Sequence, residues 1–155
     1  MSQIASSNHL LTNVVYKDFN KYLKTFLQEL VTNFPHIEHF KILNASYVVT
    51  KKLNKKWPHR LFQTNIASLY QQQILDKNEP YFMSDYFTSP FWPALVDTVK
   101  AMWIVLDGTN KDAIWNHLHL VIALNNRILA YKASKLTTRD SHSISEDDEP
   151  PLWPL

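Results

Sequence analysis

Hydrophobic residues recur at helical spacing along most of the chain, a pattern that predicts an all-α fold. The clearest stretch spans residues 18–34, where apolar side chains form one broad stripe at Phe19, Tyr22, Leu23, Phe26, Leu27, Leu30, Val31 and Phe34. Asp18 is expected to cap this helix and Pro35 to end it. We expect five or six helices to pack as a single-domain bundle around Phe, Trp and Leu side chains.

Two further helices are predicted in the middle of the chain. Residues 37–53 carry apolar positions on one face, although the β-forming residues Tyr47, Val48 and Val49 leave a strand there as the alternative. Pro58 suits the first position of a third helix that runs to about Leu75. Residues 76–90 hold two prolines and four aromatic residues, and they are expected to interrupt the helices, with a short helix inside them.

The last two helices are predicted to form an antiparallel hairpin, because apolar positions recur over 92–106 and again over 114–129. Gly108 suits the left-handed residue that follows a helix, and Asn110 suits the cap of the next one. We expect the two tryptophans that flank the turn to pack on each other. The residues expected to specify the hairpin are Trp103, Asp107, Gly108, Asn110, Ile114 and Trp115.

The two ends of the chain differ from this helical body. Residues 1–15 are small and polar before they become mildly apolar, and we expect them to form a loose arm before a helical domain at 16–135. Residues 136–155 are expected to be a disordered acidic tail. The tail ends in an apolar Trp/Pro/Leu patch, which could serve as a docking peptide or fold back onto the domain.

Composition removes several classes of function. The only glycine is Gly108, so the chain holds no glycine-rich phosphate-binding loop. It has no cysteine, which excludes disulfides, thiolate metal sites and a thiol nucleophile. The closely spaced histidines, at 36/39 and 117/119, do not follow a zinc-binding pattern. We therefore predict no enzyme activity, no metal site and no cofactor, and no small-molecule substrate is evident.

Charge is distributed unevenly along the chain. Residues 1–139 carry all 16 basic and nine of the 14 acidic residues, a net charge of +7, whereas 140–155 carry five acidic residues and no lysine or arginine, a net charge of −5. The segment 51–60 is strongly basic. Such a segment can bind phosphates and stack on a base, or it can be a solvated helix end. The candidate nucleic-acid-binding residues, with the acidic tail as a modulator, are Lys51, Lys52, Lys55, Lys56, Trp57 and Arg60.

Aromatic residues concentrate in the proline-rich segment 80–93 and return in the C-terminal patch. Exposed aromatic side chains of this kind are typical of protein-interaction surfaces. The residues predicted to contact a partner are Tyr81, Phe82, Tyr86, Phe87, Phe91, Trp92, Leu152, Trp153 and Leu155.

The stretch W-I-V-L-D-G-T-N-K-D-A-I-W-N-H-L at 103–118 resembles a recurring family of small helical proteins of large nucleocytoplasmic DNA viruses, the giant viruses of algae and amoebae. The shared pattern is a tryptophan near the end of one helix, an aspartate, an Asn-Lys turn and an Ile-Trp pair that opens the next helix. F-L-Q-E-L-V-T-N-F-P at 26–35 and I-L-D-K-N-E-P-Y-F at 74–82 are also similar to that family, whereas Gly108 and the tail depart from it. The family has no assigned activity, so the resemblance implies a viral origin and transfers no catalytic residue.

The resulting prediction is a non-enzymatic structural or protein-interaction protein of a large DNA virus. It would assemble into the virion or bind a viral or host protein, or a second copy of itself. The alternative is a nucleic-acid-binding protein that uses the basic segment. The N-terminus lacks the pattern of a secretory signal, and no apolar stretch approaches the roughly 18 residues that a membrane span needs. We therefore expect the protein in the virion or in the cytoplasm of an infected cell, and not secreted.

Overall fold

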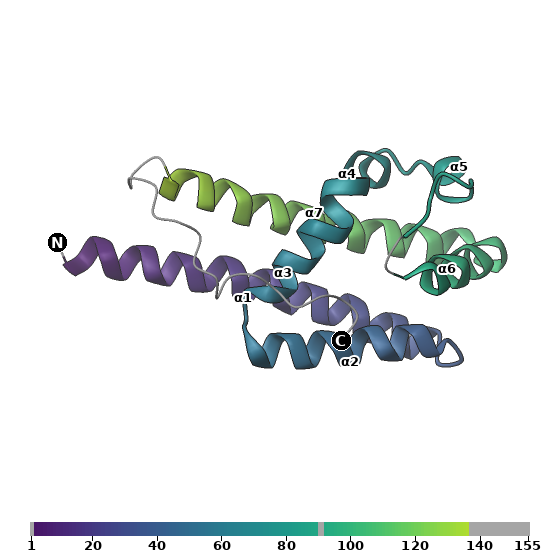
Figure 1. Cartoon of the computed structure of the whole chain (residues 1–155), viewed down its shortest axis with the longest axis horizontal. Coiled ribbons are helices and arrows are strands. Elements are labelled where there is room, and N and C mark those ends of the chain that lie inside the picture. The colour runs from purple at the N-terminus through teal and green to yellow at the C-terminus, as the bar shows by residue number, and fades with distance from the viewer. Residues whose placement is uncertain (1, 90–91, 137–155) are drawn as a thin grey trace.

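The computed structural model describes residues 2–89 and 92–136, with side chains from residue 11 onward, and every regular element in these ranges is a helix. The all-α prediction is therefore confirmed. Helices α1 (Ser2–Asn33) and α7 (Gly108–Leu136) are the two longest elements and pack along each other. Helix α2 (Glu38–Leu53) returns beside α1 (Figure 1). It includes residues 47–49, so the alternative of a strand at Tyr47, Val48 and Val49 is wrong.

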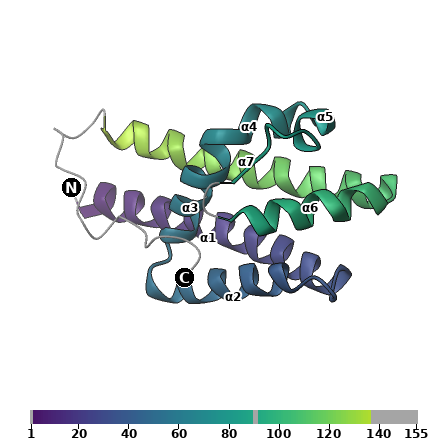
Figure 2. The ribbon, with the colours of Figure 1, turned by 45° about the vertical axis from the view of Figure 1, so that its right-hand side comes forward.

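A long helical run crosses from the α1–α2 side of the molecule to α7 (Figure 2). It consists of α3 (Trp57–Phe62), the π-helical turn η1 (Gln63–Ala67) and α4 (Ser68–Leu75), with right-handed helical backbone angles at both junctions. The predicted third helix is thus confirmed, and the π turn is a feature that no sequence pattern had indicated.

Two short helices complete the fold. Helix α5 (Glu79–Phe82) lies inside the predicted interruption, and α6 (Pro93–Val105) precedes α7. Both begin with a proline in their first two positions, where the missing N–H leaves no helical hydrogen bond unmade. Trp103 of α6 and Trp115 of α7 meet edge to face, with ring centroids 5.3 Å apart. This contact confirms the predicted packing across the hairpin turn.

The loose arm expected at residues 1–15 is wrong, because residues 2–15 belong to α1. The apolar stripe of this helix continues toward the N-terminus through Val15 and Tyr16, which are both buried. One turn earlier, Thr12 Oγ1 shares a 2.6 Å hydrogen bond with the Tyr131 hydroxyl of α7. Contact with a second long helix therefore stabilises this segment at Thr12, where its own composition gave no clear helical signal.

The predicted starts of two helices are also wrong. Asp18 lies inside α1, where its carboxylate pairs with Arg127 of α7 at 3.0 Å. Gly108 has no left-handed backbone and is itself the first residue of α7, because the chain leaves α6 through an extended residue. The α7 cap is Asp107, whose Oδ1 accepts a 2.8 Å hydrogen bond from the Asn110 backbone N–H, so Asn110 is not the cap.

The core follows the contact between α1 and α7, where Phe19, Ile122 and Ile128 are almost fully enclosed. We call the part of the molecule around α5, α6 and the start of α7 the aromatic half. The N-terminal part of α1, the α2–α3 connection and the end of α7 form the basic half (Figure 1). No helix in the described part of the chain is both long and apolar enough to cross a membrane. Beyond Leu136, the last residue of α7, the predicted tail lies outside the described residues.

Candidate functional site

The aromatic half contains a partly open apolar cavity of about 230 Å³, which we call the aromatic cavity. Side chains of α1, α2, α4, α6 and α7 build its wall, together with η1 and the segment from α5 to α6. Nearly all of this lining is apolar. The exceptions are Asn65, Tyr70, Ser89 and Lys100.

Phe82 of α5 is the centre of the aromatic wall. Its ring centroid lies 4.9 Å from that of Phe87 and 5.9 Å from that of Trp115, and Tyr70 and Tyr81 also pack on it. Edge-to-face and tilted ring pairs of this kind stabilise a fold beyond the area that they bury. The structure therefore joins the aromatic residues of the predicted contact segment to those of α4 and α7.

Hydrogen bonds to two helices hold the segment between α5 and α6 in place. The Tyr70 hydroxyl of α4 donates to the Thr88 carbonyl at 2.6 Å, and Lys100 Nζ of α6 donates to the Ser84 carbonyl at 2.7 Å. The Lys100 ammonium also lies 5.6 Å from the centroid of the Phe87 ring. Burial raises the pKa of the Tyr70 hydroxyl, so this group remains a donor at neutral pH.

The π turn η1 determines which polar groups reach the cavity from the crossing helix. An extra residue in a helix shifts the side chains that follow it onto another face. Asn65 and Ile66 of η1 line the aromatic cavity, whereas Gln63 Oε1 accepts a 2.7 Å hydrogen bond from the buried Asn125 amide of α7. Asn65 is half-buried, and none of the described residues bonds to its side chain.

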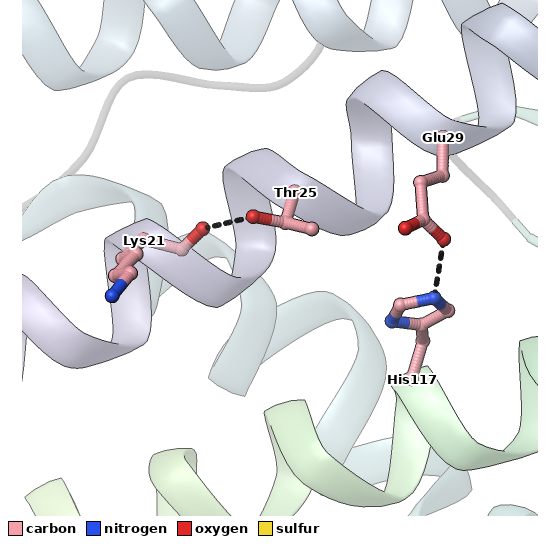
Figure 3. Close-up of polar contacts among 4 residues, drawn as sticks. All are labelled: Lys21, Thr25, Glu29 and His117. Atoms are coloured by element: carbon pink, nitrogen blue, oxygen red, sulfur yellow. Dashed lines mark hydrogen bonds and ion pairs between the residues drawn. The ribbon is translucent and has the colours of Figure 1, made fainter.

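His117 and Glu29 join α7 to α1 at the edge of the aromatic half. His117 Nε2 and Glu29 Oε2 face each other across the space between the two helices (Figure 3). The His117 ring also stacks on Phe26, with centroids 5.3 Å apart, and Phe26 lines the cavity. In residues 2–89 and 92–136, no three or more His, Cys, Asp or Glu side chains are grouped so that they could hold a metal ion.

Only part of the predicted partner-contact set meets at the cavity. Phe82, Phe87 and Trp92 line its wall. Tyr81 packs behind Phe82, and Tyr86 is 84% exposed outside the lining. The other members of the set lie outside the described residues: Phe91, Leu152, Trp153 and Leu155.

The structure gathers part of the predicted basic segment onto the middle of α1. Lys56 Nζ lies 5.7 Å from the centroid of the Tyr16 ring, and Lys132 Nζ of α7 lies 5.8 Å from the same centroid. Lys55 Nζ donates to Asn13 Oδ1 at 2.8 Å. We call Lys55, Lys56 and Lys132 the basic cluster. It combines lysines from two distant parts of the sequence, and Lys132 was not among the predicted residues.

The remaining residues of the predicted basic segment lie elsewhere. Lys51 and Lys52 are exposed on the last turn of α2, where positive charge favours the helix dipole. Trp57 begins α3 and is half-buried, as is Arg60. The lysines of the segment 51–60 are thus divided between the end of α2 and the basic cluster.

A buried polar core lies beneath the basic cluster. His59 is 1% exposed and packs edge-on against Phe19, with Asn125 beside it. Burial, followed by the charges of Lys132 and Arg60, lowers the pKa of His59 to about 3, so its ring is neutral at pH 7. The basic residues that surround His59 in the sequence give no sign of this burial, which only the tertiary contacts show.

Comparison of the chain with protein-family models, with curated proteins and with solved structures finds no match. The resemblance to the family of large DNA viruses therefore stays a prediction. Function has to be inferred from the geometry of the two halves.

Proposed function

We propose that the protein is a non-enzymatic interaction protein that binds an apolar side chain of a partner protein in the aromatic cavity. The observation that carries this proposal is a space of about 230 Å³ behind an almost wholly apolar wall. Burial of apolar surface is the main driving force of protein association. A few bulky side chains that fill pockets commonly supply most of the binding energy.

The size of the cavity favours an aromatic or large aliphatic side chain as its occupant. An apolar cavity of about 150 Å³ engineered into another protein stays dry and binds benzene. The aromatic cavity is larger, so it has room for a phenyl or indole group. Rings at its wall, among them Phe82 and Phe87, can pack on such a group edge to face.

Exposed apolar residues on the same elements favour a protein over a small molecule. Large apolar side chains stand in solvent on α4, on the α5–α6 segment and on α6, at Leu69, Tyr86, Ile104 and Val105. A small ligand inside the cavity would leave them uncovered, whereas a protein surface can bury them. The viral resemblance makes a viral or host protein the expected partner, in the virion or the infected cell.

A peptide-display selection on the full chain tests the proposal. We expect the selected peptides to share a bulky apolar residue and to lose binding to Val99→Trp, since an indole at this lining position fills the cavity from within. Leu95→Trp provides a second blocked form, and Asp112→Asn serves as an exposed control on α7. Selected peptides that bind both blocked forms as tightly as the wild type would contradict the proposal.

Nucleic-acid binding is a second candidate, and the basic cluster favours it. Lys56 and Lys132 converge on one ring from different elements, which concentrates positive charge on one face of α1. Phosphate groups bind such clusters, and each phosphate contact releases counterions.

Fluorescence anisotropy with labelled single- and double-stranded DNA and RNA tests this second candidate over a range of salt concentrations. Replacement of Lys56 and Lys132 by Gln should weaken binding and lower the salt dependence of log K for duplex DNA by about 2. Replacement of Lys51 and Lys52 by Gln removes the same charge outside the cluster and should have a smaller effect. Equal effects of the two pairs, or no binding at low salt, would rule out the cluster as the nucleic-acid site.

A further inference from the structure

We infer that the apolar side chain bound by the aromatic cavity has a carboxylate of the partner protein beside it, and that Lys100 recognises this carboxylate. The inference rests on the proposed function, because it specifies the chemistry of the group that enters the same cavity. It makes Lys100 a specificity-determining residue of an otherwise apolar site.

Lys100 is placed where an anion beside a bound apolar group would lie. It is half-buried, it lines the cavity, and its Nζ lies between the Ser84 carbonyl at 2.7 Å and the face of the Phe87 ring. Both contacts hold the flexible side chain against the wall. A lysine fixed in this way has already lost much of the conformational entropy that pairing with an anion would cost.

The ammonium of Lys100 has unused capacity for such a pair. It has three N–H donors, and the hydrogen bond to Ser84 uses one of them. No carboxylate of the described residues lies within ion-pairing distance of its Nζ. Lys111 lies near the same aromatic cluster, 5.4 Å from the Trp103 ring centroid. Unlike Lys100, it already has an acidic partner, because its Nζ pairs with Glu79 at 3.2 Å.

The composition of the wall favours a single carboxylate over a phosphate. Among the described residues that line this cavity, Lys100 is the only charged one, and the half-buried Asn65 amide adds a neutral donor. A dianionic phosphate is usually held by several cations or by the forked guanidinium of arginine. A single lysine beside apolar walls is suited to bind a single carboxylate that lies beside an apolar group.

Three indole probes of similar size but different charge test the inference on the full chain. They are indole-3-propionate, 3-ethylindole and tryptamine, an anion, a neutral molecule and a cation at pH 7. Protein-observed NMR titrations give their dissociation constants. We expect the anion to bind roughly fivefold more tightly relative to 3-ethylindole in the wild type than in Lys100→Met, and tryptamine to bind most weakly to the wild type.

Two further variants serve as controls for charge and fold. Lys111→Met removes the same charge from the same half of the molecule but outside the cavity lining, so the preference for the anion should persist. Lys100→Arg keeps a cation at the wall and should also keep the preference. It can be measured even if Lys100→Met does not fold.

The possible outcomes separate the inference from the proposed function. If 3-ethylindole binds but the ratio of the two dissociation constants is the same in the wild type, Lys100→Met and Lys100→Arg, the role of Lys100 is overturned while the cavity remains a binding site. If no probe binds, or if Val99→Trp binds all of them equally well, the cavity itself is not a site and both proposals fall. A preference for the anion that only the Lys100→Met change removes supports both.

Discussion

The aromatic half and the basic half are built on the same two long helices, yet they pack differently. In the basic half, Phe19 and Ile128 are fully enclosed, and His59 and Asn125 are buried among them. In the aromatic half, rings from six helices and from the α5–α6 segment surround an unfilled space of about 230 Å³. Protein interiors are generally close-packed, so the packing of the basic half needs no explanation beyond the stability of the fold. The unfilled half is therefore the one with space for a bound group.

Removal of a ring from the aromatic half should have the largest effect on stability. Trp115 is buried and packs on both Phe82 and Trp103, so Trp115→Ala is expected to lower the free energy of unfolding by about 3–5 kcal/mol. Urea denaturation followed by circular dichroism measures this change. Ile104→Ala, at a position that is 71% exposed, should change it by less than about 0.5 kcal/mol. A small loss for Trp115→Ala would mean that the aromatic wall is not part of the cooperative core.

Acid should expose the polar interior of the basic half. The folded-state pKa of His59 is about 3, below the ordinary value of 6.5, so the unfolded chain binds a proton that the folded chain does not. This contribution to stability is fully present above pH 6.5 and is lost as the pH falls from about 6.5 to about 3. At pH 4.5 the loss should be about 2–3 kcal/mol relative to pH 7.5. Denaturation at several pH values should show a flatter dependence for His59→Phe, and parallel curves would contradict the assignment.

A Val→Leu change should alter the free energy of unfolding in opposite directions in the two halves. Val99 borders the aromatic cavity, so Val99→Leu is expected to raise the free energy of unfolding by about 0.5–1 kcal/mol. Val121 is 1% exposed in the close-packed half, so Val121→Leu should lower it by about 1–3 kcal/mol. Denaturation midpoints of the two variants give the comparison directly. Two changes of the same sign would show that the halves do not differ in packing.

The smallest expected effect concerns the start of α7 in the aromatic half. Asp107→Ala removes the side chain that accepts the N–H of Asn110, and it should cost about 1 kcal/mol. Asn110→Ala leaves that backbone donor in place and should change stability by less than about 0.5 kcal/mol. The melting temperatures of the two variants distinguish the observed cap from the one that the sequence suggested.

Much of the fold could be predicted because local signals and tertiary contacts agree. The stripe from Phe19 to Phe34 predicted the part of α1 that packs on the core, and the tryptophans at 103 and 115 meet as expected. The first turns of α1 could not be predicted in this way. At Thr12 the support comes from Tyr131, 119 residues later in the chain, and such a contact has no local signature.

The candidate site was only partly predictable for the same reason. The aromatic cluster at 80–93 was visible in the sequence, and Phe82, Phe87 and Trp92 do meet in one wall. The space that they border depends on distances between six helices, which residue spacing does not encode. Lys100 carried no sequence signal either, because its meaning comes from the Ser84 carbonyl and the Phe87 ring that it contacts.

The cavity depends on the number of residues in the crossing helix, because η1 contains one residue more than a regular α-helical turn. One residue fewer between Gln63 and Ala67 would restore a regular α-helix and rotate everything that follows by about 100°. Tyr70 and Ile74 would then turn away from the space that they now border, while α3 kept its place on α1. The number of residues in η1 therefore separates related chains that have the cavity from those that do not. A chain with a one-residue deletion at this point would lack the cavity, however similar the rest of its sequence.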